Sequence, residues 1–229
     1  MDMAASQRVT PHIGFAPLRI VIVHNAMRDL LIASNNPGKL REFAELLQPL
    51  AARLGFRLLA PSEVGIALEV AETGQTYAQN ASLKAEALAR ASGLVTLGDD
   101  SGLEVEALDG APGLYSARYA GPGAGDADRR RKLLQELRQF PPPRPARFVC
   151  AIAVAHPRLG VRLFEGECRG EIALAERGSG GFGYDPLFYV PEYGATMAEL
   201  PPEVKNSISH RARAVQSAQP YLEDIFAAR

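Results

Sequence analysis

Apolar runs of strand length alternate with helix-like segments along most of this chain. Residues 30–33 form the first convincing strand, and residues 37–50 follow as a helix with a proline in its first turn. Residues 76–92 make the clearest amphipathic helix, because its alanines share one apolar stripe and Thr76 is suited to cap it. This alternation predicts an α/β fold in which helices cover a central sheet.

The later segments continue the same pattern. Further strands are predicted at residues 94–97, 103–107, 147–155 and 161–168, and further helices at residues 126–137 and 209–226. A proline-rich run at residues 141–145 continues neither a helix nor a central strand. We therefore expect this run to mark the boundary between two lobes.

Composition limits the class of partner. The 229 residues include 47% hydrophobic ones and carry a net charge of −1, so a sizeable core is expected and a global positive field is not. A nucleic-acid polymer and a membrane surface are thereby excluded as partners. The two cysteines, Cys150 and Cys168, lie in strand-like sequence outside any metal-binding spacing, which favours reduced thiols and a cytoplasmic location.

The first 28 residues show little periodicity. Their apolar stretch at residues 18–23 is too short to cross a bilayer, and no secretory cleavage pattern follows it. We expect residues 1–28 to be a flexible N-terminal extension without chemistry, with Met27 as an alternative start. Residues 29–229 are expected to form a single two-lobed domain.

Two adjacent carboxylates, Asp99 and Asp100, follow a predicted strand and precede Ser101 and Gly102. A strand that stops at paired acids places hard oxygen ligands at a sheet edge, where Mg²⁺ binds together with substrate phosphates. The same four residues are also typical of a plain turn, because Asp and Ser bond their own backbone. Consecutive strand residues point to opposite sides, so we expect one acid at the metal and the other bracing loop backbone.

The turn at residues 34–39 has the features of an anion site. Backbone N–H groups and the positive end of a helix dipole lie there, and Lys39 adds a mobile charge. The P-loop motif is excluded, since Ala33 and Leu40 occupy the positions where it requires Gly and Ser or Thr. A capped helix start with a solvated lysine is the alternative interpretation.

Three polar residues surround the start of the long helix at residues 76–92. Glu72 is suited either to hold a metal or to be a surface acid near the helix N-terminus. Asn80 and Lys84 share one helical face, where they meet either a triphosphate or water. The sequence leaves both alternatives open for each residue.

A glycine-rich segment at residues 178–186 carries Phe182, Tyr184 and Asp185. Dense glycine exposes the backbone, and the embedded aromatic and acidic side chains resemble a base-stacking loop with one polar reader. A long hairpin turn with one aromatic residue anchored in the core fits the same composition.

Residues 205–211 offer cationic and neutral donors at the start of the last predicted helix. Lys205, His210 and Arg211 supply these groups. A 6-keto purine presents an acceptor where adenine presents an amino donor, so donors from His210 and Arg211 favour inosine over adenosine. By itself, His210 is more typical of a capping or partly buried histidine.

Six separate segments carry a family resemblance. In chain order they are residues 34–39, residues 72–74 with Asn80, and residues 99–102, 111–119, 180–186 and 209–211. Together these segments resemble the inosine triphosphate pyrophosphatase family, bacterial type. The match extends from about residue 30 to about residue 225, and the two departures, the N-terminal extension and the proline-rich run, touch no motif.

The resemblance implies an enzyme that hydrolyses ITP, dITP and XTP, which are non-standard purine nucleoside triphosphates, to the monophosphate and pyrophosphate. It implies Mg²⁺ as the cofactor, a small-molecule nucleotide as the substrate and a homodimer as the assembly. The implied fold is a long mixed twisted β-sheet flanked by helices, with two lobes around an active-site cleft.

The resemblance also implies roles for individual residues. Asp100 is the implied proton acceptor and, with Glu72, the implied metal ligand. The implied phosphate cradle consists of Ser34, Asn35, Asn36, Pro37, Gly38 and Lys39, with Ser101 beside the substrate. The implied nucleotide-binding residues are Phe182, Gly183, Tyr184, Asp185, Lys205, His210 and Arg211. Charge considerations add Lys84, which with Lys39 and Mg²⁺ is suited to hold the leaving pyrophosphate.

Two other functional classes fit parts of this pattern. A nucleotide-sugar transferase would also use paired acids to hold a metal, but it needs a second substrate pocket. A nucleotide-binding sensor needs no proton acceptor. The products formed from ITP separate these alternatives from a pyrophosphatase.

Overall fold

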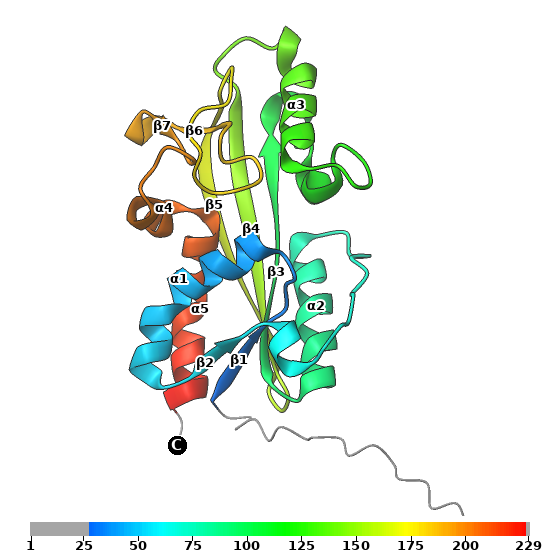
Figure 1. Ribbon diagram of the computed structural model, residues 1–229, viewed down its shortest axis with the longest axis vertical. Coiled ribbons are helices and arrows are strands. Elements are labelled where there is room, and N and C mark those ends of the chain that lie inside the picture. Colours follow the sequence, from blue (N-terminus) through cyan, green and yellow to red (C-terminus); the bar gives the residue numbers. More distant parts are fainter. Residues whose placement is uncertain (1–27, 228–229) are drawn as a thin grey trace, which may run out of the picture.

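The computed structural model describes residues 28–227 and contains a seven-stranded sheet in the order β2-β1-β3-β4-β5-β6-β7. The strands are β1 (Asp29–Ile32), β2 (Arg57–Leu59), β3 (Val95–Val105), β4 (Pro145–His156), β5 (Gly160–Ile172), β6 (Phe188–Val190) and β7 (Ala195–Thr196). Strand β1 pairs in parallel with β2 and β3, and the other neighbours pair antiparallel. The sheet is therefore mixed, and its three long strands run the length of the molecule (Figure 1). The predicted α/β class is confirmed.

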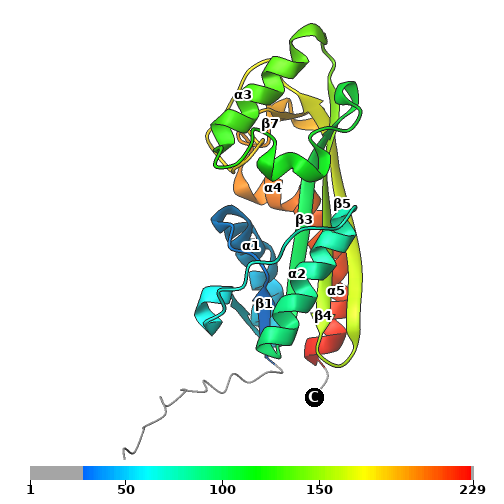
Figure 2. The same cartoon turned by 90° about the vertical axis from the view of Figure 1, so that its right-hand side faces the viewer.

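Helices cover both faces of the long strands (Figures 1 and 2). They are α1 (Pro37–Leu54), α2 (Tyr77–Ser92), α3 (Asp126–Glu136), α4 (Pro202–Ile208) and α5 (His210–Ala227), with a 3₁₀ segment, η3 (Gly113–Arg118). Helices α1 and α5 share one apolar cluster with even-numbered residues of β4, whereas α2 packs on the odd-numbered alanines of the same strand. Alternate residues of β4 thus supply two cores, one on each face.

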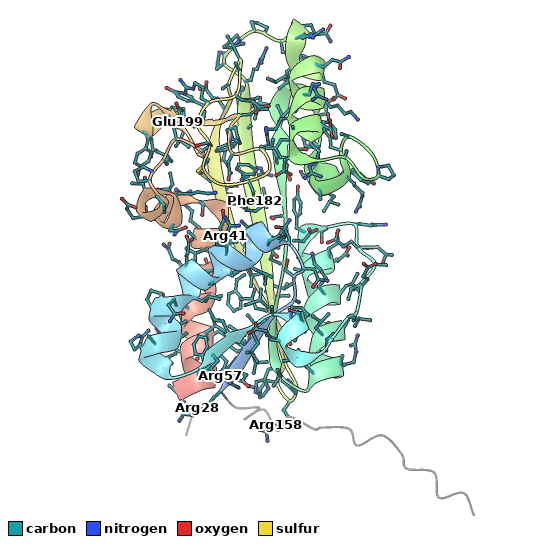
Figure 3. All side chains as sticks on the ribbon, viewed as in Figure 1. Arg28, Arg41, Arg57, Arg158, Phe182 and Glu199 are labelled. Atoms are coloured by element: carbon teal, nitrogen blue, oxygen red, sulfur yellow. The ribbon has the colours of Figure 1, made fainter. Side chains whose placement is uncertain are left out.

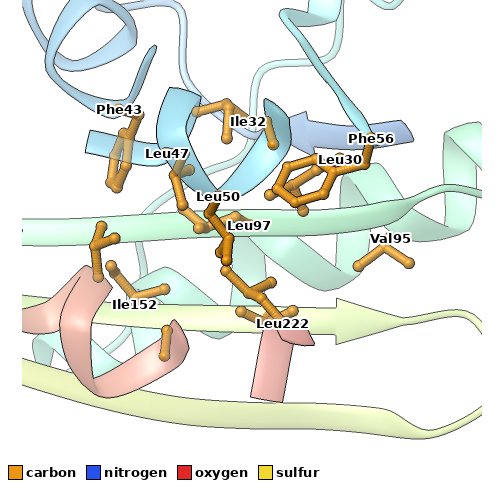
Figure 4. Packing of buried hydrophobic residues seen from close by; sticks show 14 of the residues in the cluster. Leu30, Ile32, Phe43, Leu47, Leu50, Phe56, Val95, Leu97, Ile152 and Leu222 are labelled. Atoms are coloured by element: carbon orange, nitrogen blue, oxygen red, sulfur yellow. The ribbon is translucent and has the colours of Figure 1, made fainter. Parts of the chain in front are cut away.

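The cluster beneath α1 and α5 is the larger of these two cores. Leu30, Phe43, Leu47, Leu97 and Ile152 are fully buried in it. Figure 4 shows these side chains meeting between the two helices and the sheet. Their burial fixes α1 against β1 and β3, so the turn that precedes α1 lies beside β3.

A third core lies under α3, further along the face of the sheet that α1 and α5 cover. It contains Leu133 from α3, Leu103 from β3 and Phe148 from β4. These residues lie before and after the proline-rich run, so the expected lobe boundary at residues 141–145 is wrong, because the chain on both sides packs into one core. Helix α3 already ends at Glu136, and Pro145 begins the central strand β4, which was not expected of this run. The prediction of two lobes around a cleft stays a prediction.

Strand β3 differs most from its prediction. The chain does not stop at the paired acids, because residues 94–97 and the alternating segment after them form a single strand, Val95–Val105. Glycines at 98 and 102 are typical of turns, which is why the sequence predicted a break in the strand. In the structure a Cβ at Gly98 would lie 2.6 Å from the carbonyl oxygen of Ala81 in α2. The glycine is required by close packing of α2 on the strand.

The other predicted elements are present, with shifts at their ends, whereas β2, β6, β7 and α4 had no counterpart in the prediction. Helix α1 continues four residues past its expected end because Pro49 is accommodated inside it, and Gly55 ends it in the left-handed conformation. Thr76 caps α2 as expected, its hydroxyl accepting from the N–H of Gln79 at 3.1 Å. Lys205 belongs to the separate helix α4, not to the last helix. The expected N-terminal extension lies outside the described residues, apart from Arg28, whose carbonyl accepts from Arg57 N–H.

Candidate functional site

The pocket lies where the edge of β3 is left uncovered by β1. Strand β1 pairs with β3 as far as the Ile32–Leu97 partners, and the chain then turns away into α1. Contact with this edge resumes at Leu103, whose N–H donates to Ser116 Oγ of η3 at 2.9 Å. A pocket occupies the interval, and its empty volume, open solvent included, is about 800 Å³.

Asp99 and Asp100 point to opposite sides of β3, as their adjacency predicts. Asp99 is buried, with Lys39 Nζ at 2.8 Å and Arg211 Nη2 at 3.5 Å from its Oδ2. Burial alone would raise the pKa of Asp99, but Lys39 and Arg211 more than offset it and hold the pKa well below its usual range. The expectation that the second acid braces loop backbone is wrong, because Asp99 pairs with two cations from α1 and α5.

Asp100 faces α2. Its Oδ2 accepts from Asn80 Nδ2 at 3.0 Å, and its Oδ1 lies 3.7 Å from Lys84 Nζ. The close packing of α2 on Gly98 brings both side chains to the strand. Burial raises the pKa of Asp100 and Glu72 adds to the rise, although Lys84 and Asn80 act in the opposite direction. Asp100 is therefore a stronger base than an exposed aspartate.

Glu72 joins Asp100 through a shared lysine. Lys84 Nζ lies 2.7 Å from Glu72 Oε1, and Arg118 Nη1 lies 3.5 Å from Glu72 Oε2. The loop that carries Glu72 is tied to the same place, because Asn80 Oδ1 accepts from Gly74 N–H at 2.8 Å. Two carboxylates thus face one ammonium group at the rim of the pocket.

A divalent cation fits this arrangement only in part. Among residues 28–227, no group of three or more His, Cys, Asp or Glu side chains is placed to hold a metal ion. Mg²⁺, however, is commonly bound by one or two carboxylates with substrate phosphates and waters completing its shell. Glu72 and Asp100 match that donor set, with Lys84 placed where a cation would sit between them.

The turn between β1 and α1 is a capped helix N-terminus. Asn36 Oδ1 accepts from Lys39 N–H at 3.1 Å, and Ser34 Oγ accepts from Asn36 N–H at 3.2 Å. Asn35 and Pro37 are exposed. Lys39 does not remain solvated, because it turns inward to Asp99 while lining the pocket. The same turn therefore caps the start of α1 and places the Lys39 ammonium group at the pocket.

The segment at residues 178–186 closes the opposite wall. Phe182 lies against α1 where Gly38 has no side chain, since a Cβ there would lie 2.7 Å from its ring (Figure 3). Tyr184 is buried and donates its hydroxyl to the carbonyl of Ser116 at 2.9 Å. Tyr184 is thus the core anchor of the loop, and Phe182 is its aromatic wall.

A second buried ion cluster joins this loop to α1, α4 and α5. Lys205 Nζ lies 2.6 Å from Asp185 Oδ2 and 2.7 Å from Glu42 Oε1. Arg211 pairs with Glu42 as well and donates to Ser101 Oγ at 3.0 Å. Burial would raise the pKa of Glu42, but Arg211 and Lys205 lower it below its usual range.

His210 lies at the floor of the pocket. Its ring stacks on Phe148 with centroids 4.7 Å apart, and its buried Nδ1 has no hydrogen-bond partner in the described part of the chain. Burial, with the nearby charges of Arg211 and Lys205, lowers its pKa well below the ordinary value. At neutral pH the imidazole is uncharged and retains one unpaired polar atom.

Most of the predicted site residues share this pocket. Those lining it are Asn36, Lys39, Glu72, Asp100, Ser101, Phe182, Gly183, Tyr184, Asp185, His210 and Arg211. Pro37, Gly38 and Lys205 line an adjoining hollow on the other side of Phe182. Ser34, Asn35 and Lys84 line neither hollow, although Lys84 contacts Glu72 and Asp100.

Sequence reasoning missed Glu42, Asp126 and Arg129, which also line the pocket. Glu42 lies one helical turn after Lys39 in α1, so it shares a face with a predicted phosphate ligand. That spacing would have identified it. Asp126 and Arg129 belong to α3. Its sequence indicates only a basic surface helix, so no pattern in it pointed to the pocket.

Comparison with known proteins agrees with this geometry. The sequence model of the Ham1 family matches residues 30–221, which includes every segment that builds the pocket. The chain belongs to the Ham1 family. The predicted resemblance to inosine triphosphate pyrophosphatases is thereby confirmed.

Curated relatives in the Ham1 family match over nearly their full length. A dITP/XTP pyrophosphatase of Geobacillus kaustophilus is 50% identical over 200 residues, covering 87% of this chain and 96% of the relative. The dITP/XTP pyrophosphatase of Bacillus subtilis is 44% identical over 198 residues, covering 86% of this chain and 98% of the relative.

Solved Ham1 structures have the same fold. The Ham1 protein of Staphylococcus aureus superposes with a TM-score of 0.75 at 43% identity, covering 86% of this chain and 99% of that one. A HAM1 protein from Coxiella burnetii gives a TM-score of 0.76 at 40% identity, with coverage of 86% and 99%. The mixed sheet flanked by helices is therefore a property of the family.

Within residues 28–227, none of the helices is long and apolar enough to span a bilayer. Cys150 and Cys168 are both buried free thiols, as their positions in strands predict.

Proposed function

We propose that this chain hydrolyses non-standard purine nucleoside triphosphates, namely ITP, dITP and XTP, to the nucleoside monophosphate and pyrophosphate. The observation that carries the proposal is the position of Asp100. This buried carboxylate, with a raised pKa, lies at the uncovered edge of β3 near a second carboxylate, Glu72, and lines the pocket. The printed activity of the curated relatives, dITP/XTP pyrophosphatase, supports the same assignment.

Asp100 is the proposed proton acceptor for the attacking water. Asn80 holds its Oδ2, which leaves Oδ1 toward Lys84 and the pocket. A carboxylate whose pKa lies above its ordinary value takes a proton from water more readily than an exposed aspartate does. The neighbouring amide therefore orients the base, and burial adjusts its strength.

Glu72 and Asp100 are the proposed ligands of Mg²⁺, which when bound supplies positive charge to the phosphates and acidity to water. The cations that now neutralise these carboxylates, Lys84 and Arg118, are then free to meet the triphosphate. Lys39 and the N–H groups at the start of α1 lie on the neighbouring side of the pocket. Cations on both sides would stabilise the negative charge that builds up on the pyrophosphate as it leaves.

The purine base is proposed to lie between Phe182 and the buried group that contains His210 and Arg211. The unpaired Nδ1 of His210 is an available polar atom for a base or sugar edge. Arg211 is a donor suited to the 6-keto oxygen of hypoxanthine or xanthine, and an adenine amino group would face it unpaired.

The test is a product analysis with ITP, dITP, XTP, GTP and ATP in the presence and absence of Mg²⁺. Equal amounts of monophosphate and pyrophosphate from ITP, dITP and XTP, with much slower turnover of GTP and ATP, are expected. Release of orthophosphate would place the cut at the γ position. Binding of ITP without turnover would favour a sensor, and turnover that requires a sugar phosphate would favour a transferase.

The assembly and location are proposed on the same resemblance. We infer a homodimer, measured by light scattering coupled to size-exclusion chromatography, and a monomer at working concentration would contradict it. The cytoplasm is the proposed compartment, because two buried free thiols suit a reducing environment.

A further inference from the structure

The first turns of α3 hold the loop at residues 178–186 by the backbone N–H and the backbone carbonyl of one residue, Gly183. Asp126 Oδ2 accepts from the N–H of Gly183 at 2.8 Å. Arg130 Nη1 donates to the carbonyl of the same Gly183 at 2.8 Å. Among residues 28–227, these are the two side-chain contacts that fix the loop at Gly183. Gly183 lies between Phe182 and Tyr184 in sequence.

Gly183 is a point at which the loop would otherwise be free to move. Its φ of 62° is in the left-handed region, which glycine adopts at little cost but which does not by itself select one conformation. Phe182 is fixed on the other side, since its N–H donates to Asp185 Oδ2 at 2.9 Å. The direction of the Phe182 ring therefore depends on both the Asp185 contact and the contacts to Gly183.

The two residues on α3 are themselves held in place. Asp126 pairs with Arg129, whose Nη1 donates to the carbonyls of Ala117 and Ala124 at 2.8 and 2.9 Å. Arg130 Nε lies 3.0 Å from Glu176 Oε2, and the Arg130 side chain is only 15% exposed. Partial burial would raise the pKa of Asp126, but the Gly183 N–H and Arg129 lower it, so the carboxylate is ionised at neutral pH.

These contacts differ from those of neighbouring charges on the same helix. Asp128 and Arg131 pair with each other at 2.9 Å, with side chains 48% and 73% exposed, and no contact to the loop is present among the residues that the structure describes. Asp128 Oδ2 also accepts from the N–H of Gly125 at 3.1 Å, so this carboxylate caps the start of α3. Helix α3 thus presents an acid and an arginine to the loop and a similar pair to solvent. The second pair is a natural control for the first.

We propose that Asp126 and Arg130 are positioning residues for base recognition. They hold the backbone N–H and carbonyl of Gly183 and thereby fix the position of the Phe182 ring that forms one wall of the nucleotide pocket. The inference rests on the proposed function and deepens it. Neither residue is expected to touch the phosphates, which lie on the side of Lys39 and Lys84. Loss of either one should weaken binding of the base and leave the binding of pyrophosphate unchanged.

The experiment compares Asp126→Ala and Arg130→Ala with the controls Asp128→Asn and Arg131→Ala, where the amide of Asp128→Asn still accepts from the N–H of Gly125 and so preserves the cap of α3. Two constants are measured for each protein by calorimetry in EDTA: the Kd of ITP and the Kd of inorganic pyrophosphate. KM and kcat for ITP are then measured with Mg²⁺. Asp126→Asn is included because its amide oxygen can still accept from Gly183 N–H.

The expected result is a rise of about tenfold in KM and in the Kd of ITP for Asp126→Ala and Arg130→Ala, equivalent to about 1.4 kcal/mol. Pyrophosphate affinity and kcat should stay within about twofold of wild type. Asp126→Asn should recover part of the ITP affinity, and both control variants should behave as wild type.

Two results would overturn the positioning role. One is unchanged ITP affinity in both loop-side variants, and the other is an equal loss of ITP and pyrophosphate affinity, which would indicate general damage to the pocket. Inactivity of the wild-type protein toward ITP would instead contradict the proposed function. The calorimetric comparison would still decide the role of α3 in that case, because it does not need turnover.

Discussion

Asp99→Asn is expected to destabilise the folded chain strongly, although Asp99 lies next to Asp100, the proposed catalytic base. The amide keeps the shape of the side chain but removes the negative charge shared by Lys39 and Arg211. The Arg211 side chain is 2% exposed, so it has no access to water as a substitute. Removing one partner of a buried ion pair costs about 3–5 kcal/mol.

The lower end of that range applies here, about 3 kcal/mol, because two contacts soften the loss. Arg211 keeps Glu42 as a counter-ion, and Lys39, whose side chain is 16% exposed, can turn toward solvent. For a chain of this length, each kcal/mol lowers the melting temperature by about 2–4 °C. The expected shift is therefore about 6–12 °C at pH 7.

Urea unfolding followed by circular dichroism between pH 3 and pH 7 is the assay. The folded pKa of Asp99 lies below its unfolded value, so its ionised form adds stability above pH 4 that is lost as the pH falls toward the folded pKa. The difference between wild type and Asp99→Asn should be full at pH 7 and smaller at pH 3. An Asp99→Asn protein as stable as wild type at pH 7, or a difference independent of pH, would refute this reasoning.

Three further substitutions test the site. Asp100→Asn should fold with at least wild-type stability, because burial raises the pKa of this acid and its charge is unfavourable in the folded state, whereas kcat should fall by about 10²–10⁴. Gly98→Ala should cost about 1–3 kcal/mol of unfolding free energy and lower kcat, since its Cβ would press on the carbonyl of Ala81 and move α2 away from Asp100. Arg211→Lys keeps the charge but not the paired donors, so kcat/KM for ITP should fall more than the residual rate on ATP, and equal losses would indicate a phosphate role. Stability from urea unfolding and initial rates of pyrophosphate release measure all three.

Local periodicity predicted the elements that bury one apolar face. The helix at residues 76–92 was predictable to within one residue, because its alanine stripe and its threonine cap are both local signals. The extent of strand β3 was not predictable. Glycines at 98 and 102 are typical of turns, but in this strand they are needed for close packing. At Gly102 the neighbours are Tyr77 and the carbonyl of Gly113, which come from distant parts of the chain. No local pattern distinguishes these two reasons for a glycine.

The site was predictable where a motif placed a charged residue at the end of an element. Lys39 at the start of α1 and Asp100 on β3 are examples, and both line the pocket. Their partners were not predictable from composition. Glu42 contacts residues about 160 positions later in the chain, Lys205 and Arg211, and only the packing of α1 against α4 and α5 brings them together.

The two consecutive aspartates explain how one strand carries both structure and chemistry. Asp99 points toward α1 and α5 and is saturated by Lys39 and Arg211, so its charge stabilises the fold and is unavailable as a base. Asp100 points toward α2, where Asn80 orients it and Lys84 stands off at 3.7 Å, so its charge is less compensated and its pKa rises. Because adjacent strand residues face opposite sides, a single register of β3 fixes both environments. A one-residue slip of the strand would change both environments, placing Asp100 among the cations of α1 and α5 in one direction or Asp99 beside Asn80 and Lys84 in the other.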